Sequence, residues 1–236
     1  MQRILHEWKI SYYTQPLLLL VLFIALIISI RKRKKYKILS TFPFYIIFLI
    51  MVHTTGTAST LSSAIKYHPK FFWGLTEYTD YGFTIFEIVT FSVFFYQLID
   101  NLLLKRIIIV ANLVFILFSI YMFITSHAFY QFNFQITKST VYTVEGVILF
   151  MICLFYFIEF FKKPPTLNLK NEPVFWISTG ALFFFAGTLP YSVLENHIIR
   201  NYRDVYYPSY SIFYIFYILL FLMIIRAYLC KPGKTT

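Results

Sequence analysis

The sequence is poor in charged residues, in glycine and in cysteine. Asp, Glu, Lys and Arg make up 13% of its 236 residues, against about 25% in an average soluble domain. So little charge beside 59% hydrophobic residues excludes an intrinsically disordered chain. The two cysteines, Cys153 and Cys230, lie in a long apolar run and beside a basic cluster, which argues against a disulfide framework.

The common signatures of nucleotide-binding and hydrolytic enzymes are missing as well. The sequence has no Walker loop, no GxGxxG, no GxSxG and no internal repeat. The connections between its apolar segments are too short for a kinase, nucleotide-binding or DNA-binding module. We therefore expect no nucleic-acid partner, despite the net charge of +11, and no cofactor.

Long apolar runs dominate the sequence instead. A transmembrane helix needs about 20 mostly apolar residues, and seven segments qualify: 12–30, 38–56, 76–98, 106–126, 139–161, 174–195 and 209–228. We therefore predict an all-α membrane protein, a seven-transmembrane-helix bundle that forms a single domain over residues 1–236. The first segment ends in RKRKKYK rather than at a small-residue cleavage site, so we interpret it as a retained helix and not as a signal peptide.

The basic residues are distributed unevenly along the chain. The stretches that follow the first, third, fifth and seventh segments carry most of the 21 lysines and arginines. Because short cytoplasmic loops are enriched in Lys and Arg, the N-terminus is predicted outside and the C-terminus in the cytoplasm. The positive charge would then form a rim that faces the anionic lipid of the bilayer, in a multi-pass protein of the inner (plasma) membrane.

Polar side chains interrupt the apolar segments, and they gather toward the predicted outer ends. In segment 76–98 the spacing of Glu77, Asp80, Thr84 and Glu87 puts them on one helix face. The same region of the other segments holds His53, Tyr142, Glu145, Tyr191, Glu195, Tyr210 and Tyr214. Charged groups in hydrocarbon cost a few kcal/mol and nearly always face the bundle interior or a water-filled cavity. These residues therefore predict a ligand pocket that is open to the outside and closed toward the cytoplasm.

The polar residues also allow simpler interpretations. Glu77, Asp80 and Glu195 are close enough to the surface that solvation, or hydrogen bonding between helices, explains each of them equally well. Glu87 and Glu145 lie deeper, and for them a functional role is favoured. They would be protonated, or paired with a histidine, a tyrosine or a cationic ligand.

Two other classes of seven-helix protein share some of these sequence features. All five histidines fall on the predicted outer side, and imidazole and carboxylate are zinc ligands, as in a metal-dependent membrane lipid hydrolase. The absence of HxxxH and HExxH and of any histidine in segment 209–228 argues against that class. A retinal photoreceptor needs a lysine inside its last helix, and segment 209–228 has none.

The stretches VEGVILFMICLFYFIEFFKKP and NEPVFWISTGALFFFAGTLPYSVLEN resemble part of a known group. The chain is similar there to small bacterial (Bacteroidetes-type) seven-transmembrane proteins, whose fifth span carries a Glu followed by YF and whose sixth opens with PxFWIxxG. It resembles more distantly the seven-helix input modules of sensor histidine kinases. The matching residues are Glu145, Tyr156, Phe157, Pro173, Phe175, Trp176, Ile177 and Gly180. The resemblance covers about a quarter of the chain and implies a topology and an association with signalling.

Together these features predict a sensory or receptor-like membrane module. Glu87 and Glu145 would anchor an unknown small ligand or a proton, and segment 174–195 would move about Pro190, which removes a backbone hydrogen bond. Because no kinase is fused here, the change would pass to a separate histidine kinase or other cytoplasmic regulator. The lipid hydrolase stays open as an alternative, and so does a structural or assembly subunit of a membrane complex.

Overall fold

The chain folds into long α-helices. A computed structural model describes residues 2–32, 37–64, 70–128, 134–162 and 169–230. Within these ranges there are seven α-helices, two short 3-10 turns and no β-strand, which confirms the all-α prediction. The helices are α1 (Gln2–Lys32), α2 (Phe42–Ala64), α3 (Lys70–Leu98), α4 (Leu102–Ala128), α5 (Phe134–Lys162), α6 (Pro173–Asn201) and α7 (Arg203–Leu229), and the turns are η2 (Lys37–Leu39) and η3 (Leu169–Asn171).

Six of the seven helices are long and apolar enough to cross a membrane. The spans are Thr14–Lys32, Tyr78–Leu98, Leu102–Thr125, Lys138–Lys162, Pro173–Ile198 and Ser211–Leu229. The apolar part of α2, Phe42–Gly56, is shorter than these spans. A helix satisfies its backbone hydrogen bonds internally, which is what a segment in lipid requires. Length and composition are therefore those of a multi-pass membrane protein.

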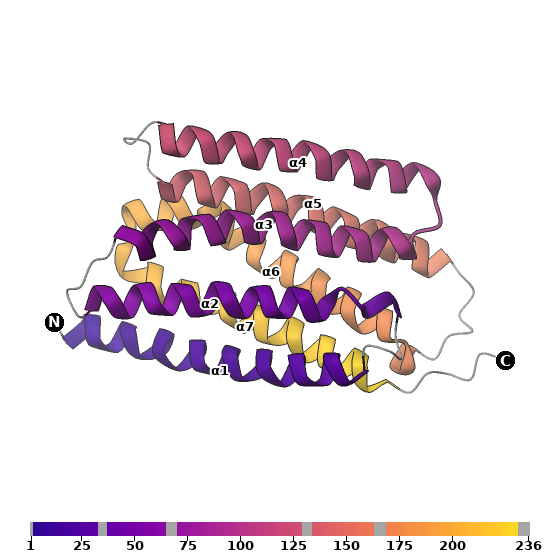
Figure 1. The fold of residues 1–236 in the computed structure, drawn as a ribbon, viewed down its shortest axis with the longest axis horizontal. Helices are drawn as coiled ribbons and strands as arrows, with labels where there is room; N and C mark the ends of the chain where they lie inside the picture. The colour runs from indigo at the N-terminus through magenta and orange to yellow at the C-terminus, as the bar shows by residue number, and fades with distance from the viewer. Residues whose placement is uncertain (1, 33–36, 65–69, 129–133, 163–168, 231–236) are drawn as a thin grey trace.

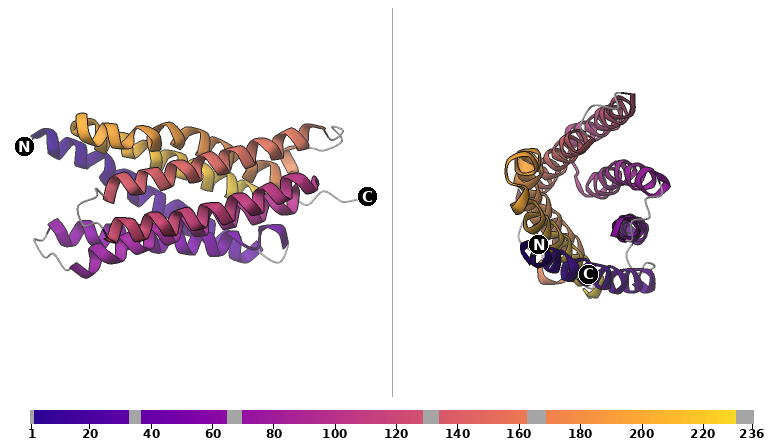
Figure 2. Two further views of the ribbon diagram at one scale, coloured as in Figure 1. Left: turned by 90° about the horizontal axis from the view of Figure 1, so that it is seen from above. Right: turned by 90° about the vertical axis from the view of Figure 1, so that its left-hand side faces the viewer.

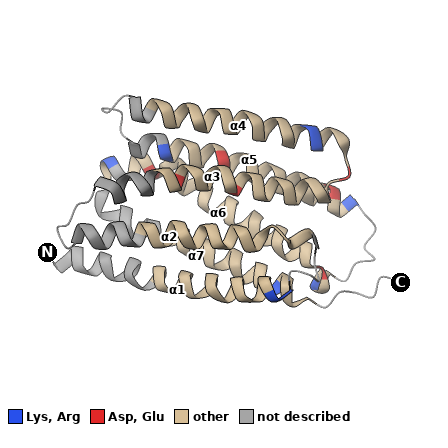
Figure 3. Ribbon diagram, viewed as in Figure 1, with Lys and Arg blue, Asp and Glu red and all other residues tan. Residues whose placement is uncertain are grey.

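The helices lie side by side along one axis, and their connections lie at the two ends of the bundle (Figure 1). We call the end where α1 begins the N-terminal end and the end where α7 finishes the C-terminal end. Described lysines and arginines lie mostly at the C-terminal end (Figure 3). They are Arg31, Lys32, Lys105, Arg106, Lys162, Lys170 and Arg226, whereas Lys138 and Arg200 lie toward the N-terminal end.

Six helices close into a ring, and the seventh lies outside it. Around the ring, α1 packs on α2, α2 on α3, α3 on α5, α5 on α6, α6 on α7, and α7 returns to α1. Helix α4 packs mainly on α3 and α5, and the end-on view places it at the edge of the bundle (Figure 2). Only the six ring helices therefore have a side that faces a common interior.

Aromatic side chains fill the interior of the helix ring toward the C-terminal end. Phe42 on α2 meets Phe91 and Phe94 on α3 edge to face, with ring centroids 5.7 and 5.2 Å apart, and all three are fully buried. Edge-to-face pairs of this kind are favourable beyond the area that they bury. At the very end, the Tyr228 hydroxyl donates to the carbonyl of Leu39 over 2.7 Å and ties α7 to η2. Aromatic side chains dominate this half of the bundle, and its buried polar side chains carry hydroxyl groups, as at Ser29, Ser92 and Ser178.

Candidate functional site

Polar side chains from all six ring helices are found from the middle of the bundle toward the N-terminal end. Helices α3 and α5 contribute Asp80, Thr84, Glu87, Lys138, Ser139 and Glu145, and the other four contribute Gln15, Tyr45, His53, Thr188, Tyr191, Ser192, Ser211 and Tyr214. Many are fully buried, as polar groups in a membrane bundle are when they face other helices rather than lipid. The polar residues divide into a central cluster, an ion pair and an aromatic cluster around His53.

The central cluster is built on the hydrogen bond between Tyr45 and Glu87. The Tyr45 hydroxyl on α2 donates to Oε1 of Glu87 on α3 over 2.5 Å. Both side chains are buried, and the Tyr45 ring is stacked between Phe83 and Phe221, with centroids 5.9 and 6.0 Å away. The stacked rings fix the position of the hydroxyl, so that it points at the carboxyl group.

Glu145 on α5 completes the central cluster. It is 3% exposed, like Glu87, and it is close enough to Glu87 and Tyr45 for its charge to act on both. Within the described part of the chain, its Oε1 atom is buried and has no hydrogen-bond partner. No lysine or arginine of that part forms an ion pair with either glutamate. The cluster thus holds two carboxyl groups and one hydroxyl donor.

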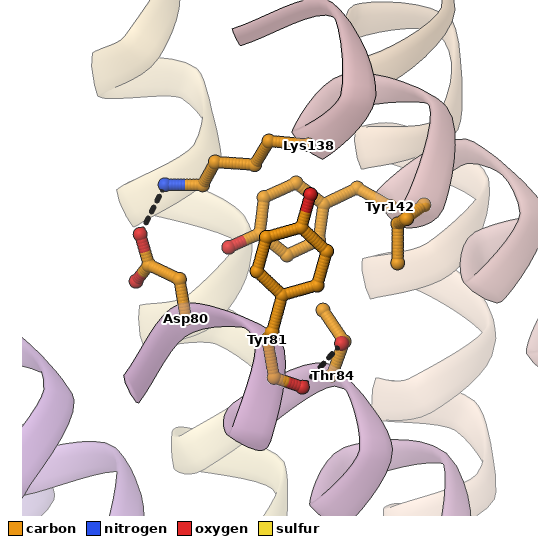
Figure 4. A pocket seen from close by; sticks show the side chains of 6 residues that line it. Asp80, Tyr81, Thr84, Lys138 and Tyr142 are labelled. Atoms are coloured by element: carbon orange, nitrogen blue, oxygen red, sulfur yellow. Dashed lines mark hydrogen bonds and ion pairs between the residues drawn. The ribbon is translucent and has the colours of Figure 1, made fainter. Parts of the chain in front are cut away.

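An ion pair lies two helical turns nearer the N-terminal end. Lys138 on α5 pairs with Asp80 on α3, and its ammonium group lies 5.5 Å from the centroid of the Tyr142 ring (Figure 4). Lys138 is expected from the sequence to precede the span 139–161, but α5 begins at Phe134 and carries Lys138 into the bundle. The ion pair offsets the charge of Asp80, so a structural role explains the presence of Asp80 inside the bundle.

The ion pair sets the register between α3 and α5. Both helices run from the N-terminal to the C-terminal end (Figure 1), and Glu87 and Glu145 follow Asp80 and Lys138 by seven residues each. Seven residues are close to two turns of a helix. Because Asp80 touches Lys138, Glu87 and Glu145 lie at the same level of the same seam, as their electrostatic interaction requires.

A shallow hollow opens beside the ion pair. It is lined by Asp80, Tyr81, Thr84, Lys138, Val141 and Tyr142 and contains about 140 Å3 of space between atoms, without enclosing room for a water molecule (Figure 4). The Thr84 hydroxyl donates to the carbonyl of Tyr81 over 2.9 Å. Asp80, Thr84 and Tyr142 of the predicted pocket therefore line one hollow, and their side chains largely fill it.

His53 belongs to an aromatic cluster on the α1, α2 and α7 side of the interior. Its ring centroid lies 5.8 Å from that of Tyr214 and 6.0 Å from that of Tyr217. The Tyr214 hydroxyl accepts a hydrogen bond from Gln15 on α1 over 2.8 Å. Tyr214 is also close enough to Asp80 to be affected by its charge, so this cluster faces the same interior as the ion pair.

The other predicted pocket residues are placed as follows. Tyr191 on α6 is buried and packs against Phe213, with ring centroids 6.0 Å apart. Glu195, one turn further along α6, is half-buried. Glu77 and Tyr210 fall within α3 and α7, but their side chains lie outside the described part of the structure.

The described side chains include no group of three or more His, Cys, Asp or Glu that could hold a metal ion. No protein-family model, curated protein or solved structure matches the chain. The strongest indication of function is therefore the geometry of the cluster formed by Tyr45, Glu87 and Glu145.

Proposed function

We propose that the chain is a sensory or receptor-like membrane module whose polar interior responds to a ligand or proton from outside the cell. The observation that carries this proposal is the burial of two carboxyl groups, those of Glu87 and Glu145, in the interior of the helix bundle. Ionisable groups at such positions are costly, and in membrane proteins they mark ligand, ion or proton sites. Polar groups concentrated in one half of the bundle suit reception at that side better than a path through the membrane.

The topology that we propose has seven spans, with α2 as the additional one, and the N-terminus outside. Support comes from the described basic residues, which lie mostly at the C-terminal end (Figure 3). Cytoplasmic ends of membrane helices are enriched in Lys and Arg. The polar half of the interior then opens toward the outside of the inner (plasma) membrane, and the aromatic half faces the cytoplasm.

Helix α6 is the element that we propose to transmit the change. It passes close to the central cluster, contains Pro190, and packs along α7 over much of its length. At the C-terminal end, Trp176 of α6 and Arg226 of α7 both donate to the carbonyl of Lys170, over 3.1 and 3.4 Å. A shift of α6 against α7 would therefore change the surface offered to a separate cytoplasmic partner, such as the histidine kinase that the resemblance implies.

The first test is crosslinking in native membranes, followed by affinity purification and mass spectrometry. We expect a histidine kinase or another cytoplasmic regulator to be recovered with the wild-type chain. We expect the output of that partner to lose its response in Glu87→Gln and Glu145→Gln, because both changes remove an ionisable group without changing its size. Glu159→Gln, near the C-terminal end of α5 and outside the predicted pocket, is the matched control and should respond like the wild type.

Other outcomes would favour the alternatives. Recovery of stoichiometric membrane subunits alone would favour a structural or assembly role, and stoichiometric zinc in the purified protein would favour a metal-dependent lipid hydrolase. A regulator whose response is the same in both glutamine variants would contradict the role given to Glu87 and Glu145.

A further inference from the structure

We propose that Tyr45, Glu87 and Glu145 form a proton-binding site, in which Glu145 carries the proton and Glu87 is the carboxylate that accepts from Tyr45. The inference names the ligand of the sensory site and rests on the proposed function only for the consequence of binding. The geometry of the cluster supports the proton site independently of that function.

The cluster has more hydrogen-bond acceptors than donors when both of its carboxyl groups are ionised. An ionised carboxylate only accepts hydrogen bonds, whereas a protonated one also donates. Among the described residues, the cluster has a single hydrogen-bond donor, the Tyr45 hydroxyl, and that hydroxyl donates to Glu87 Oε1. Glu145 Oε1 is buried without a donor. A proton on Glu145 turns that carboxyl group into a donor and removes the cost of a bare carboxylate in the apolar interior.

The charges of the cluster lead to the same assignment. Two carboxylates at one level of a buried seam repel each other, and a shared environment of this kind keeps one of them neutral. The nearest described cation on these two helices, Lys138, is paired with Asp80 two turns away. Glu87 has the Tyr45 hydroxyl to stabilise a negative charge, whereas Oε1 of Glu145 has no donor among the described residues. Glu145 is therefore the group that is better kept neutral.

A proton also fits the available space better than a metal cation does. Hard cations such as Na⁺ or Ca²⁺ need several oxygen ligands at defined distances. The cluster has two carboxyl groups, and the described side chains include no group of three His, Cys, Asp or Glu that could hold a metal ion. Fully buried apolar residues flank the cluster one turn toward the C-terminal end, at Phe91 on α3 and Leu149 on α5. A proton needs no cavity.

Other titratable groups lie on the helices around the site. They are Asp80 on α3, Lys138 and Cys153 on α5, Tyr191 on α6, Tyr214 and Tyr217 on α7, and His53 on α2. Asp80 and Lys138 offset each other as an ion pair, and the tyrosines and Cys153 are neutral near pH 7 by their ordinary chemistry. Histidine is the one residue type in this set whose ordinary pKa lies near neutral, so the test must separate any signal of His53 from that of the carboxyl groups.

Infrared spectroscopy makes that separation, because a protonated carboxyl group has a C=O stretching band that neither imidazole nor carboxylate shares. The full chain, purified and reconstituted in lipid nanodiscs, is measured across a pH titration with and without ¹³C-labelled glutamate. We expect a carboxylic-acid band near neutral pH that shifts with the label. It should be lost in Glu145→Gln and retained in Glu87→Gln and in the control Glu159→Gln.

Three results would overturn the proposal. They are the absence of a glutamic-acid band in the wild type near neutral pH, a band that survives Glu145→Gln, and a band that sodium chloride abolishes but potassium chloride does not, which would identify a cation site. If Glu145→Gln does not fold, the labelled wild type still decides whether the folded protein holds a neutral glutamic acid. The measurement involves no partner, so it can succeed where the signalling proposal fails, and the reverse.

Discussion

The hydroxyl group of Tyr45 makes a buried hydrogen bond between two helices at the centre of the bundle. Tyr45 joins α2 to α3 through its bond to Glu87, and its ring is stacked within the aromatic interior. Deleting a donor leaves a buried acceptor unsatisfied, which costs more than the net value of the bond itself. The hydroxyl of Tyr45 is therefore expected to matter more for stability than that of a tyrosine at the lipid-facing surface.

Tyr45→Phe is expected to destabilise the protein by about 1–3 kcal/mol, because the ring stays in place and the carboxyl group of Glu87 loses its donor. The measurement is reversible unfolding in mixed detergent micelles. Tyr121→Phe, on the exposed side of α4, is the matched control and should change stability by less than about 0.5 kcal/mol. Equal effects of the two substitutions would show that the bond to Glu87 contributes nothing.

The two glutamates of the cluster can be recognised in the sequence, whereas Tyr45 cannot. Glu87 and Glu145 stand out because a carboxylate in an apolar run is rare. Tyr45 does not stand out, because the chain has 20 tyrosines and many of them lie in apolar segments. The pairing of Lys138 with Asp80 depends on where α5 begins, and hydropathy does not report how far a helix extends beyond the hydrocarbon.

At the scale of helices, the close approach of α6 and α7 depends on small residues. A methyl group on Gly187 would lie 2.2 Å from Cζ of Phe216, and one on Gly180 would lie 2.8 Å from Cβ of Met223. Small residues let membrane helices pack with their backbones close together. The two glycines are seven residues apart, so they lie on one side of α6, which faces α7.

Gly187→Ala is expected to destabilise the bundle by about 1–3 kcal/mol, because α6 and α7 must separate or the Phe216 ring must move. The thermal midpoint in detergent measures the loss. Gly146→Ala is the matched control, since its methyl group would meet Leu189 at an ordinary 3.7 Å. There alanine should be neutral or stabilising by up to about 1 kcal/mol through helix propensity. Equal midpoints for the two variants would contradict the tight packing of α6 on α7.

Hydropathy locates the helices but not their ends. Helix α3 begins at Lys70 rather than at residue 76, and α2 continues to Ala64 rather than stopping at residue 56. Backbone hydrogen bonds do not require an apolar side chain, so a helix continues into polar sequence until a turn ends it. In α1 even Pro16 lies within the helix.

For the whole molecule, the position of α4 outside the ring agrees with its composition. Its span is the most apolar of the six and has the smallest buried share, whereas that of α3 is the least apolar and has the largest. A helix that faces lipid on most sides has no use for polar residues, and a helix that lines the interior can carry them. The difference in hydropathy between the two spans can be read from the sequence. Which helices neighbour one another cannot be read from it, because packing between side chains decides their arrangement.

Thiol labelling tests the membrane topology that we propose. Asn201→Cys and Asn171→Cys place exposed residues at the two ends of α6, and the parent chain, whose native cysteines are both buried, is the control. With the N-terminus outside, we expect an impermeant thiol reagent to label position 201 in intact cells and position 171 only in inverted vesicles, because the basic ends of membrane helices stay in the cytoplasm. The reverse pattern would contradict the orientation.

The same reagent decides whether α2 is a seventh span. Lys32→Cys lies at the end of α1, and Asn101→Cys follows α3, so two crossings, by α2 and α3, separate them if α2 spans the membrane. Both positions should then be labelled in inverted vesicles and protected in intact cells. If α2 lies in the interface instead, the two positions would fall on opposite sides. The Tyr45–Glu87 bond favours the first result, because an interfacial α2 would not bring that hydroxyl to a carboxyl group halfway along α3.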